Sequence, residues 1–293
     1  MNVFLKHIYN NCEDWGIELL PYDNVIKLIY GFEEKRLSNI GIDIDGGEIT
    51  DIKIYFSNGS NDERFYSEKS MSIFKDNKNY YLRDIKKHFS YNETDGIDAI
   101  RKIIGDHTTI IANRYIEIGK IIQNHTDTRV FPFFGGGKVL KDNKVCGYKL
   151  YYTFYSYVKS GAKFGYIDVQ NTYACILELL LHFRINESIK KTVISILDYY
   201  KNKAVITLLG INTDVVGYEE YKLYFIIPKE TLEERKNNLK RINSLLGNDE
   251  YSEASGLFID MLESFDNPSF MPLELCLSIN NNKIKLKSYF RTK

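Results

Sequence analysis

The sequence predicts an α/β (α+β) fold in which antiparallel β-hairpins alternate with amphipathic helices. Three observations lead to this fold class. The spacing of apolar residues switches repeatedly from about 3.5 residues, typical of a helix, to about 2, typical of a strand. Turn residues separate pairs of alternating segments, as at Asp45-Gly46-Gly47. The first and third hairpins are also alike in sequence, which indicates a repeated supersecondary unit.

Helices are predicted where apolar residues recur at helical spacing. Pro21 suits the first position of a helix, Thr231 and Glu234 form a capping-box pattern, and Gly247 can end the helix that follows. A short helix is predicted over 80–89. The other predicted helices are 2–15, Pro21 to Ile29, 108–122, 169–184, 187–200, Thr231 to Leu246 and Ala254 to Phe265.

Four hairpins are predicted from period-two alternation on both sides of a turn. The run Gly135-Gly136-Gly137-Lys138 hints at a phosphate-binding loop. No Ser or Thr follows the lysine and no helix is predicted there, so the run is interpreted as a hairpin loop. No Pro- or Ser-rich linker divides the chain, and residues 1–293 are expected to form a single domain. The hairpins pair Leu37 to Asp45 with Thr50 to Phe56, Arg129 to Phe134 with Val145 to Tyr157, Ala204 to Asp214 with Tyr218 to Ile227, and Leu273 to Ile279 with Lys283 to Phe290.

Composition narrows the functional class. Lys+Arg and Asp+Glu both number 39 in 293 residues, and this balance argues against a nucleic-acid binder that works by bulk charge. The 4 cysteines are scattered and the 5 histidines show no metal-ligand spacing, so no metal site is predicted. No secretory leader and no apolar run of about 18 residues is seen. These features predict a soluble, cytoplasmic protein without a membrane span. The 23 tyrosines suit half-buried or lined surfaces, although an AT-rich genome gives the same bias.

Alternation assigns each strand residue to one of two faces, because neighbouring side chains point to opposite sides. One face is apolar and is expected to pack against the helices. It holds Ile40, Ile42, Ile44, Ile52, Ile54, Phe56, Leu150, Tyr152, Phe154, Leu223, Phe225, Ile227, Leu273, Leu275, Leu277, Ile284 and Leu286. The other face is rich in lysine and tyrosine. It holds Asp43, Lys53, Tyr55, Lys149, Tyr151, Tyr155, Asn212, Lys222, Tyr224, Glu274, Lys285, Lys287, Tyr289 and Arg291.

The lysine and tyrosine face allows two architectures. In an open sheet with helices on one side it would face water, which is common for antiparallel sheets. The repetition favours closure into an antiparallel barrel without edges, with helices outside and this face lining the lumen. Several cations in a lumen repel one another and cost desolvation energy. Such a lumen suits an anion such as diphosphate, and the tyrosine π-faces could screen a carbocation.

A recurring Lys-x-aromatic pattern on the return strands carries a family resemblance. Lys53-x-Tyr55, Lys149-x-Tyr151 and Lys222-x-Tyr224 stand at equivalent hairpin positions. With the helix–hairpin–helix order, they resemble the ABBA-type (αββα-repeat) prenyltransferases, and the peptide prenyltransferases of cyanobactin type most. The resemblance covers most of the chain and implies a PT barrel of about ten strands. Only four hairpins are evident in the sequence, so the remaining pair lies in 60–82 or 128–165, or is absent.

The resemblance implies roles for individual residues. It implies that prenyl diphosphate is the co-substrate, that the cations of the inner face bind its diphosphate, and that the tyrosines of this face shield the allylic cation. The family places a glutamate on the inner face of the first strand, where Asp43 is the best match for a catalytic carboxylate. A solvated or lysine-paired aspartate is an equally good reading of Asp43. The implied diphosphate ligands are Lys53, Lys149, Lys222, Lys287 and Arg291, and the implied cation shield is Tyr55, Tyr151, Tyr224 and Tyr289.

The expected activity is transfer of an allylic group, dimethylallyl or geranyl, from its diphosphate to an aromatic small molecule or a peptide side chain. Mg²⁺ assists the diphosphate in some family members, and the sequence does not decide whether it does so here. No Asp-Asp-x-x-Asp motif supports a metal-clamped helical prenyl synthase. The alternative is a non-catalytic barrel that binds a ligand or peptide. A third interpretation is an unrelated open-sheet α+β protein.

Overall fold

The structure is a computed structural model of the chain. It describes residues 2–30, 36–57, 67–73, 82–83, 85–87, 93–105, 109–126, 131–141, 144–158, 163–166, 169–214, 219–248, 253–264, 270–280 and 282–292. Within them, no helix has both the length and the apolar character needed to cross a bilayer.

Helices and strands alternate along the chain. The helices are α1 (Asn2–Asp14), α2 (Tyr22–Tyr30), α3 (Glu93–Ile104), α4 (Thr109–Thr126), α5 (Val169–His182), α6 (Glu187–Tyr200), α7 (Leu232–Leu245) and α8 (Glu253–Glu263). The strands are β1 (Arg36–Asp45), β2 (Glu48–Ser57), β3 (Ser67–Ser72), β4 (Leu82–Arg83), β5 (Ile85–Lys87), β6 (Phe133–Lys141), β7 (Lys144–Thr153), β8 (Tyr155–Val158), β9 (Lys163–Tyr166), β10 (Val205–Asp214), β11 (Glu219–Ile226), β12 (Phe270–Ile279) and β13 (Ile284–Thr292).

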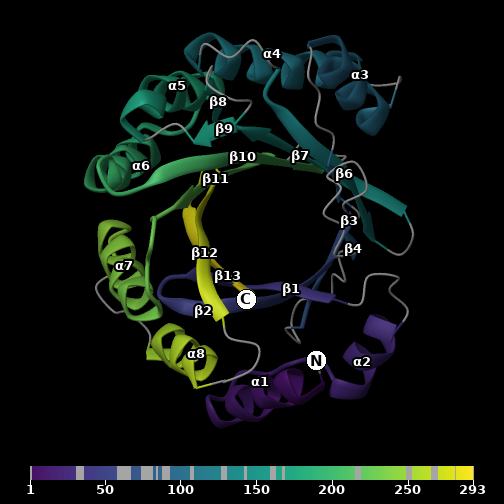
Figure 1. Cartoon of the computed structure of the whole chain (residues 1–293), viewed down its shortest axis with the longest axis vertical. Coiled ribbons are helices and arrows are strands. Elements are labelled where there is room, and N and C mark those ends of the chain that lie inside the picture. The colour runs from purple at the N-terminus through teal and green to yellow at the C-terminus, as the bar shows by residue number, and fades with distance from the viewer. Residues whose placement is uncertain are drawn as a thin grey trace.

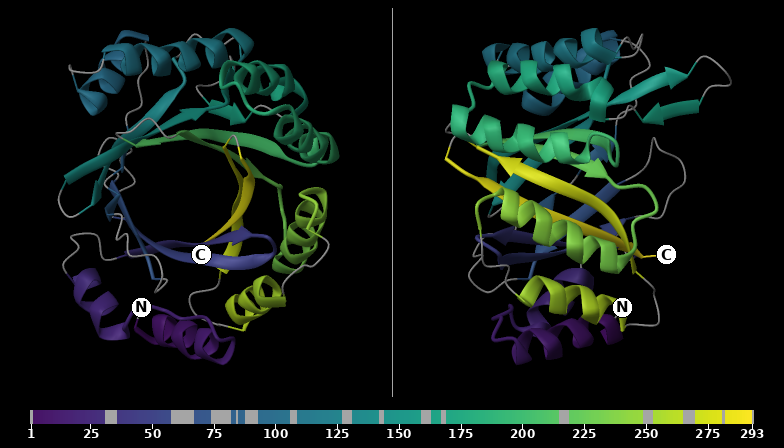
Figure 2. Two further views of the ribbon diagram at one scale, coloured as in Figure 1. Left: turned by 180° about the vertical axis from the view of Figure 1, so that it is seen from behind. Right: turned by 90° about the vertical axis from the view of Figure 1, so that its left-hand side faces the viewer.

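The strands form a large antiparallel sheet that curls into a barrel-like shape (Figure 1). Its 11 strands lie in the order β4-β6-β5-β3-β2-β1-β13-β12-β11-β10-β7, and β6 also pairs with β7. Strands β8 and β9 form a separate two-stranded sheet. The helices lie around the outer side of the curled sheet in both views of Figure 2. The predicted antiparallel sheet with outer helices is therefore confirmed.

The core lies between the outer face of the sheet and the helices. Ile40, Ile42 and Ile44 of β1 are buried there, as the alternation predicts. Tyr152 of β7 belongs to the same face, and its hydroxyl donates to the carbonyl of Tyr115 in α4 at 2.7 Å. The ring centroids of Phe4 in α1 and Phe270 in β12 lie 4.6 Å apart with the ring planes tilted by 32°, and this contact joins the first helix to the sheet. The apolar residues of the alternating strands and the residues of the outer helices thus form one continuous apolar layer.

Two sequence-based predictions of secondary structure are wrong. The helix predicted over 80–89 is replaced, in its described part, by β4 and β5, which pair with β6. The glycine run read as a loop lies inside β6, where Gly136 pairs with Leu150. A Cβ at Gly136 would lie 2.5 Å from the carbonyl oxygen of Lys149. The glycine is therefore explained by a close backbone approach in a strand, and a loop is not needed.

Leu273 is also placed on the wrong face by the alternation. The register of β12 against β13 shifts between Pro272 and Leu275, and an irregularity of this kind turns the side chains before it to the opposite face. Leu273 accordingly packs against the tyrosines of the inner face, while Leu275 and Leu277 remain in the outer core.

The predicted start of α7 is confirmed and gives a first test of local stability. Glu234 N–H donates to Thr231 Oγ1 at 3.1 Å, and Thr231 N–H donates to Glu234 Oε2 at 2.8 Å. Replacing Thr231 by alanine removes the first bond and is expected to lower the free energy of unfolding by about 1 kcal/mol. Urea denaturation checks this. A Thr192→Ala variant, in the middle of α6, controls for loss of a threonine, and an equal loss in both would contradict the capping role.

Candidate functional site

The inner face of the curled sheet carries a cluster of tyrosines separate from the main core. Tyr55, Tyr151, Tyr224 and Tyr289 gather there around Cys276, and Phe134, Leu208 and Leu273 pack against them. The ring centroids of Tyr55 and Tyr289 lie 5.9 Å apart, those of Tyr224 and Tyr289 5.9 Å, and those of Tyr151 and Tyr224 6.2 Å. The four rings form a continuous aromatic layer, which we call the tyrosine layer.

Two glycines make room for this layer. A Cβ at Gly41 would lie 2.8 Å from Cδ1 of Tyr289, and a Cβ at Gly210 would lie 3.1 Å from Cε2 of Tyr224. Gly41 stands opposite Tyr289 in the β1–β13 ladder, and Gly210 stands opposite Tyr151 in the β10–β7 ladder. Each ring therefore leans over a neighbouring strand at a position without a side chain.

A Gly41→Ala variant tests this packing. The added methyl group is expected to displace the Tyr289 ring and to lower the free energy of unfolding by about 1–3 kcal/mol, as overpacking does. Gly210→Ala is the matched control, because its nearest contacts are looser, and its loss is expected to be smaller. Urea denaturation and near-ultraviolet circular dichroism of the tyrosines would measure both effects. A larger loss in Gly210→Ala would contradict the packing described here.

An ionic layer lies two residues along the strands from the tyrosine layer. On the β1 side, Asp43 Oδ2 accepts bonds from Lys53 and Lys287, both at 2.5 Å. Lys53 also pairs with Asp51 Oδ2 at 2.7 Å, and Ser72 donates to Asp51 Oδ1 at 2.5 Å. Asp43 therefore bridges the lysines of two strands that flank β1.

The β10 side of the ionic layer is built around Glu220. Its Oε2 pairs with Lys222 at 2.8 Å and accepts from the Asn212 side-chain amide at 2.5 Å. Ser278 donates to Oε1 of the same carboxylate. Lys149 stands opposite Asn212 in the β10–β7 ladder and is only 2% exposed. Its ammonium lies 4.8 Å from the centroid of the Tyr151 ring, a cation–π contact that joins the two layers.

Burial and charge act in opposite directions on the acids of this layer. Burial raises the pKa of the Asp43 carboxyl, but the charges of Lys287 and Lys53 outweigh it and hold that pKa well below its usual range. Burial also raises the pKa of the Glu220 carboxyl, but the charges of Lys222 and Lys287 outweigh this effect and lower that pKa. Burial raises the pKa of the Cys276 thiol to about 12 even though Lys222, Lys287 and Lys149 act against it. Both carboxylates are therefore charged at neutral pH, and the thiol is not.

The structure brings most of the predicted site residues together. The four tyrosines form the tyrosine layer, and Asp43 with Lys53, Lys149, Lys222 and Lys287 lies in the ionic layer. Arg291 is apart from the ionic layer: it is exposed, stands opposite Asn39, and its Nε contacts Met271 Sδ at 3.1 Å. Lys285 pairs with Asp45 at 3.2 Å instead. The side chain of Tyr155 lies outside the described residues.

Sequence reasoning missed the acids that balance the lysines. Asp51 and Glu220 stand two positions before Lys53 and Lys222, on the same face by alternation. This i, i+2 relation was a usable signal. The partners Ser72 and Ser278 come from neighbouring strands and had no local signal of this kind, because they are defined only by strand pairing.

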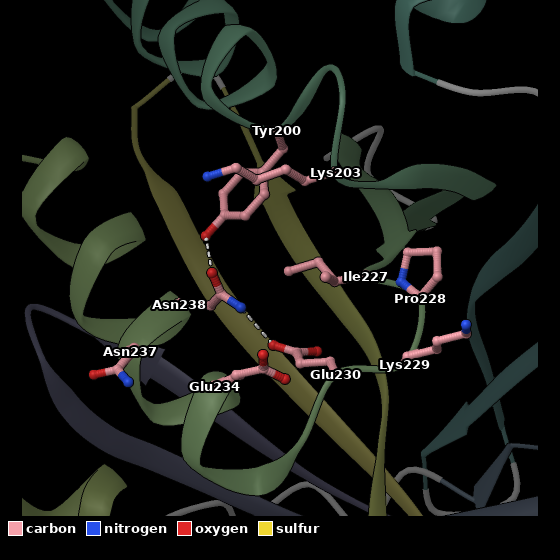
Figure 3. A pocket seen from close by; sticks show the side chains of 9 residues that line it. All are labelled: Tyr200, Lys203, Ile227, Pro228, Lys229, Glu230, Glu234, Asn237 and Asn238. Atoms are coloured by element: carbon pink, nitrogen blue, oxygen red, sulfur yellow. Dashed lines mark hydrogen bonds between the residues drawn. The ribbon is translucent and has the colours of Figure 1, made fainter.

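A hollow lies outside the sheet, between α6, α7 and the end of β11. It is a pocket of about 440 Å³. Figure 3 shows a chain of hydrogen bonds across it, from the Tyr200 hydroxyl to Asn238 Oδ1 at 2.9 Å and from Asn238 Nδ2 to Glu230 Oε1 at 2.7 Å. None of the residues that the resemblance implies for catalysis, diphosphate binding or the cation shield lines it. The polar groups in that chain bond to one another, which indicates a structural role.

No protein-family model matches the chain, and no curated protein sequence is detectably similar to it. Functional reasoning therefore depends on the two layers. Across the described ranges, no three His, Cys, Asp or Glu side chains come together as a metal-ligating group. The chemistry that the layers offer is charge-assisted binding of an anion beside an aromatic wall.

Proposed function

We propose that this chain is a prenyltransferase, which binds an allylic diphosphate at the ionic layer and passes its prenyl group to an aromatic or peptide side-chain acceptor. One observation carries the proposal: the lysines of the ionic layer and the rings of the tyrosine layer alternate on the same face of β2, β7, β11 and β13. Residues two apart in a strand are separated by about 7 Å. That spacing suits a diphosphate beside the first carbons of its prenyl chain.

The proposal includes closure of the sheet into a barrel. Strand β6 pairs with β5 through Lys86 and Gly136, and with β7 along most of its length. The other strands pair in succession in the order β7, β10, β11, β12, β13, β1, β2, β3 and β5. The two pairings of β6 would therefore complete a ring and remove both sheet edges. A closed ring would keep water from a reactive cation, which an open sheet with a wet face would not.

The chemistry follows from the two layers. The bond between the allylic carbon and the diphosphate oxygen breaks, and diphosphate leaves with the electron pair. Lysine ammonium groups stabilise that developing negative charge. The tyrosine faces stabilise the allylic cation. The nucleophilic atom of the acceptor then bonds to the allylic carbon, and its proton passes to the released diphosphate or to water.

Asp43 is better suited to hold lysines than to accept this proton. Its low pKa and its two lysine partners make it a weak base. We therefore give it the role of orienting Lys53 and Lys287. Carboxylate oxygens are ligands that Mg²⁺ prefers, but Asp43 and Asp51 already bind Lys53. A Mg²⁺ ion would accordingly enter with the diphosphate.

The same observation on Asp43 favours a second candidate function. A barrel without a free carboxylate base could bind a prenyl diphosphate, or another amphiphilic anion, without transferring it. In that case the ligand would leave unchanged. The two candidates differ in the product and share the binding site.

Incubation with prenyl diphosphates tests the proposal. We expect a mass gain of one prenyl group when the protein is mixed with dimethylallyl or geranyl diphosphate, Mg²⁺ and a panel of tryptophan, tyrosine and short cyclic peptides. The product yield should fall by at least about tenfold in Lys222→Met, because a charge-assisted contact to diphosphate is lost. Lys191→Met, on the outer helix α6, is the matched control and should behave like the wild type. Binding of the diphosphate without any product would favour the non-catalytic barrel.

A further inference from the structure

The hollow between α6, α7 and the end of β11 has a floor that is fixed by hydrogen bonds. The chain from Tyr200 through Asn238 to Glu230 forms this floor, and Arg235 Nη2 donates to the other oxygen of Glu230 at 2.6 Å. The side chains of Arg235 and Glu230 are 0% and 1% exposed, so their charges compensate each other below the hollow. The volume of about 440 Å³ is within the range of small-molecule sites.

The Tyr200 end of the hollow is positively charged. Lys203 Nζ lies 4.3 Å, and Arg241 Cζ 5.0 Å, from the centroid of the Tyr199 ring, which packs edge-on against Tyr200. Burial raises the pKa of the Tyr200 hydroxyl, and the charge of Arg241 opposes that rise, so this charge reaches the hollow. Among the residues that the structure describes, neither cation has a carboxylate at ion-pair distance, although other lysines of α6 and α7 do. Two cations at one ring without a counter-charge favour an anion.

The other end of the hollow is acidic. Figure 3 shows the carboxylates of Glu230 and Glu234 at the end away from Lys203, with the Asn238 amide between the two ends. Glu234 is exposed, and its Oε2 accepts the N–H of Thr231 at 2.8 Å. In the described part of the chain, Glu234 Oε1 accepts no hydrogen bond. A carboxylate with an oxygen open to solvent suits an ammonium group.

The remaining wall of the hollow is formed by an apolar pair, an amide and a strained turn. Ile227 and Pro228 line it at the end of β11, and Asn237 of α7 lines it with an exposed side-chain amide. Lys229 has a φ of 62°, in the left-handed region that residues other than glycine rarely adopt. Backbone strain of this kind is concentrated at functional sites. Figure 3 shows the Lys229 side chain directed away from the hydrogen-bonded chain, so its backbone turn shapes the hollow and its charge does not.

We infer that this hollow binds a small peptide zwitterion of dipeptide size, with its terminal carboxylate at Lys203 and Arg241 and its ammonium group at Glu234. The charged ends of a dipeptide are separated by about 7 Å, so a dipeptide matches a hollow with opposite charges at its two ends better than one α-amino acid does. Its peptide group can bond to the Asn237 amide, and an apolar side chain can pack on the apolar pair. The hollow lies outside the sheet, so this inference does not depend on the proposed function.

Three matched probes test which charges the hollow recognises. Glycyl-leucine carries both charges, N-acetyl-glycyl-leucine lacks the ammonium group, and glycyl-leucinamide lacks the carboxylate. Isothermal titration calorimetry at low salt is expected to give a Kd of about 1 mM or tighter for glycyl-leucine. Each of the other two probes is expected to bind at least about fivefold more weakly, because one charge-assisted contact is lost.

Two single-residue variants connect the binding to the two ends of the hollow. Lys203→Met removes the cation that lines it, and Glu234→Gln removes the negative charge while a glutamine at this position still suits the capping box of α7. Each is expected to weaken glycyl-leucine binding at least about fivefold. Lys201→Met is the matched control, because that lysine lies in the same turn after α6 and does not line the hollow.

The outcomes decide for or against the site. Weaker binding in Lys203→Met and Glu234→Gln, with wild-type binding in Lys201→Met, would support it. No heat of binding with glycyl-leucine at about 10 mM, equal binding of the three probes, or equal binding by all variants would overturn it. Far-ultraviolet circular dichroism of each variant establishes that binding is compared between folded proteins. If a variant is unfolded, the comparison of the three probes on the wild type decides alone.

Discussion

Replacing Arg235 by alanine is expected to lower the free energy of unfolding by about 3–5 kcal/mol, because it leaves the buried carboxylate of Glu230 without its positively charged partner. The guanidinium and carboxylate side chains of Arg235 and Glu230 are 0% and 1% exposed, and their closest N–O distance is 2.6 Å. Arg235 Nη1 also donates to Ser288 Oγ at 2.9 Å and to the Glu274 carbonyl at 3.1 Å. The side chain thus joins α7 to β12 and β13.

A double substitution separates the two parts of this loss. Most of the cost of Arg235→Ala should come from the uncompensated charge of Glu230, so Glu230→Gln in the same chain is expected to restore part of the stability. Urea denaturation of the single and double variants measures the coupling. Lys236→Ala is the matched control, because that lysine is the next residue and its ion pair with Asp260 lies at the surface. Its loss should be below about 1 kcal/mol. Equal losses at 235 and 236 would contradict the role of burial.

The sequence predicted which face of the sheet a side chain lies on more accurately than it predicted where each strand occurs. Alternation identified Ile40, Ile42 and Ile44 as core residues because a strand with one buried face must alternate. The same rule failed at Leu273, where a register irregularity in β12 moves the side chain to the inner face. It also failed at Gly136, which has no side chain to carry a pattern. That strand is defined by how closely the backbone of β7 approaches it, and only the folded structure contains this information.

The candidate site shows the same division between local and tertiary signals. Lys53 and Tyr55, or Lys222 and Tyr224, are recognisable as pairs because both members lie on one strand face. The connection of Asp43 to Lys287 links residues 244 positions apart and depends on the pairing of β1 with β13. The low pKa of Asp43, which argues against its predicted catalytic role, follows from that pairing.

Acidification is expected to unfold the protein through the ionic layer. The pKa values of Asp43 and Glu220 are lowered from ordinary values of 3.8 and 4.5, although burial acts in the opposite direction. The folded state therefore keeps both groups charged at pH values where the unfolded chain binds protons. Their stabilisation is complete above about pH 5 and is lost as the pH falls through 4 toward the folded-state pKa values. Each group should contribute on the order of 2 kcal/mol to this loss.

Urea denaturation between pH 7 and pH 3 measures this loss, and variants assign it. Glu220→Gln and Asp43→Asn are each expected to be less stable than the wild type at pH 7 and to show a flatter dependence below pH 5, because the group whose protonation drives unfolding has been removed. Asp260→Asn removes a carboxylate at the surface and should keep the slope of the wild type. An unchanged slope in both inner-face variants would place the acid sensitivity elsewhere in the chain. A flattened slope would show that, without a bound anion, the charged carboxylates of Asp43 and Glu220 stabilise the folded state by compensating the buried lysines of the inner face.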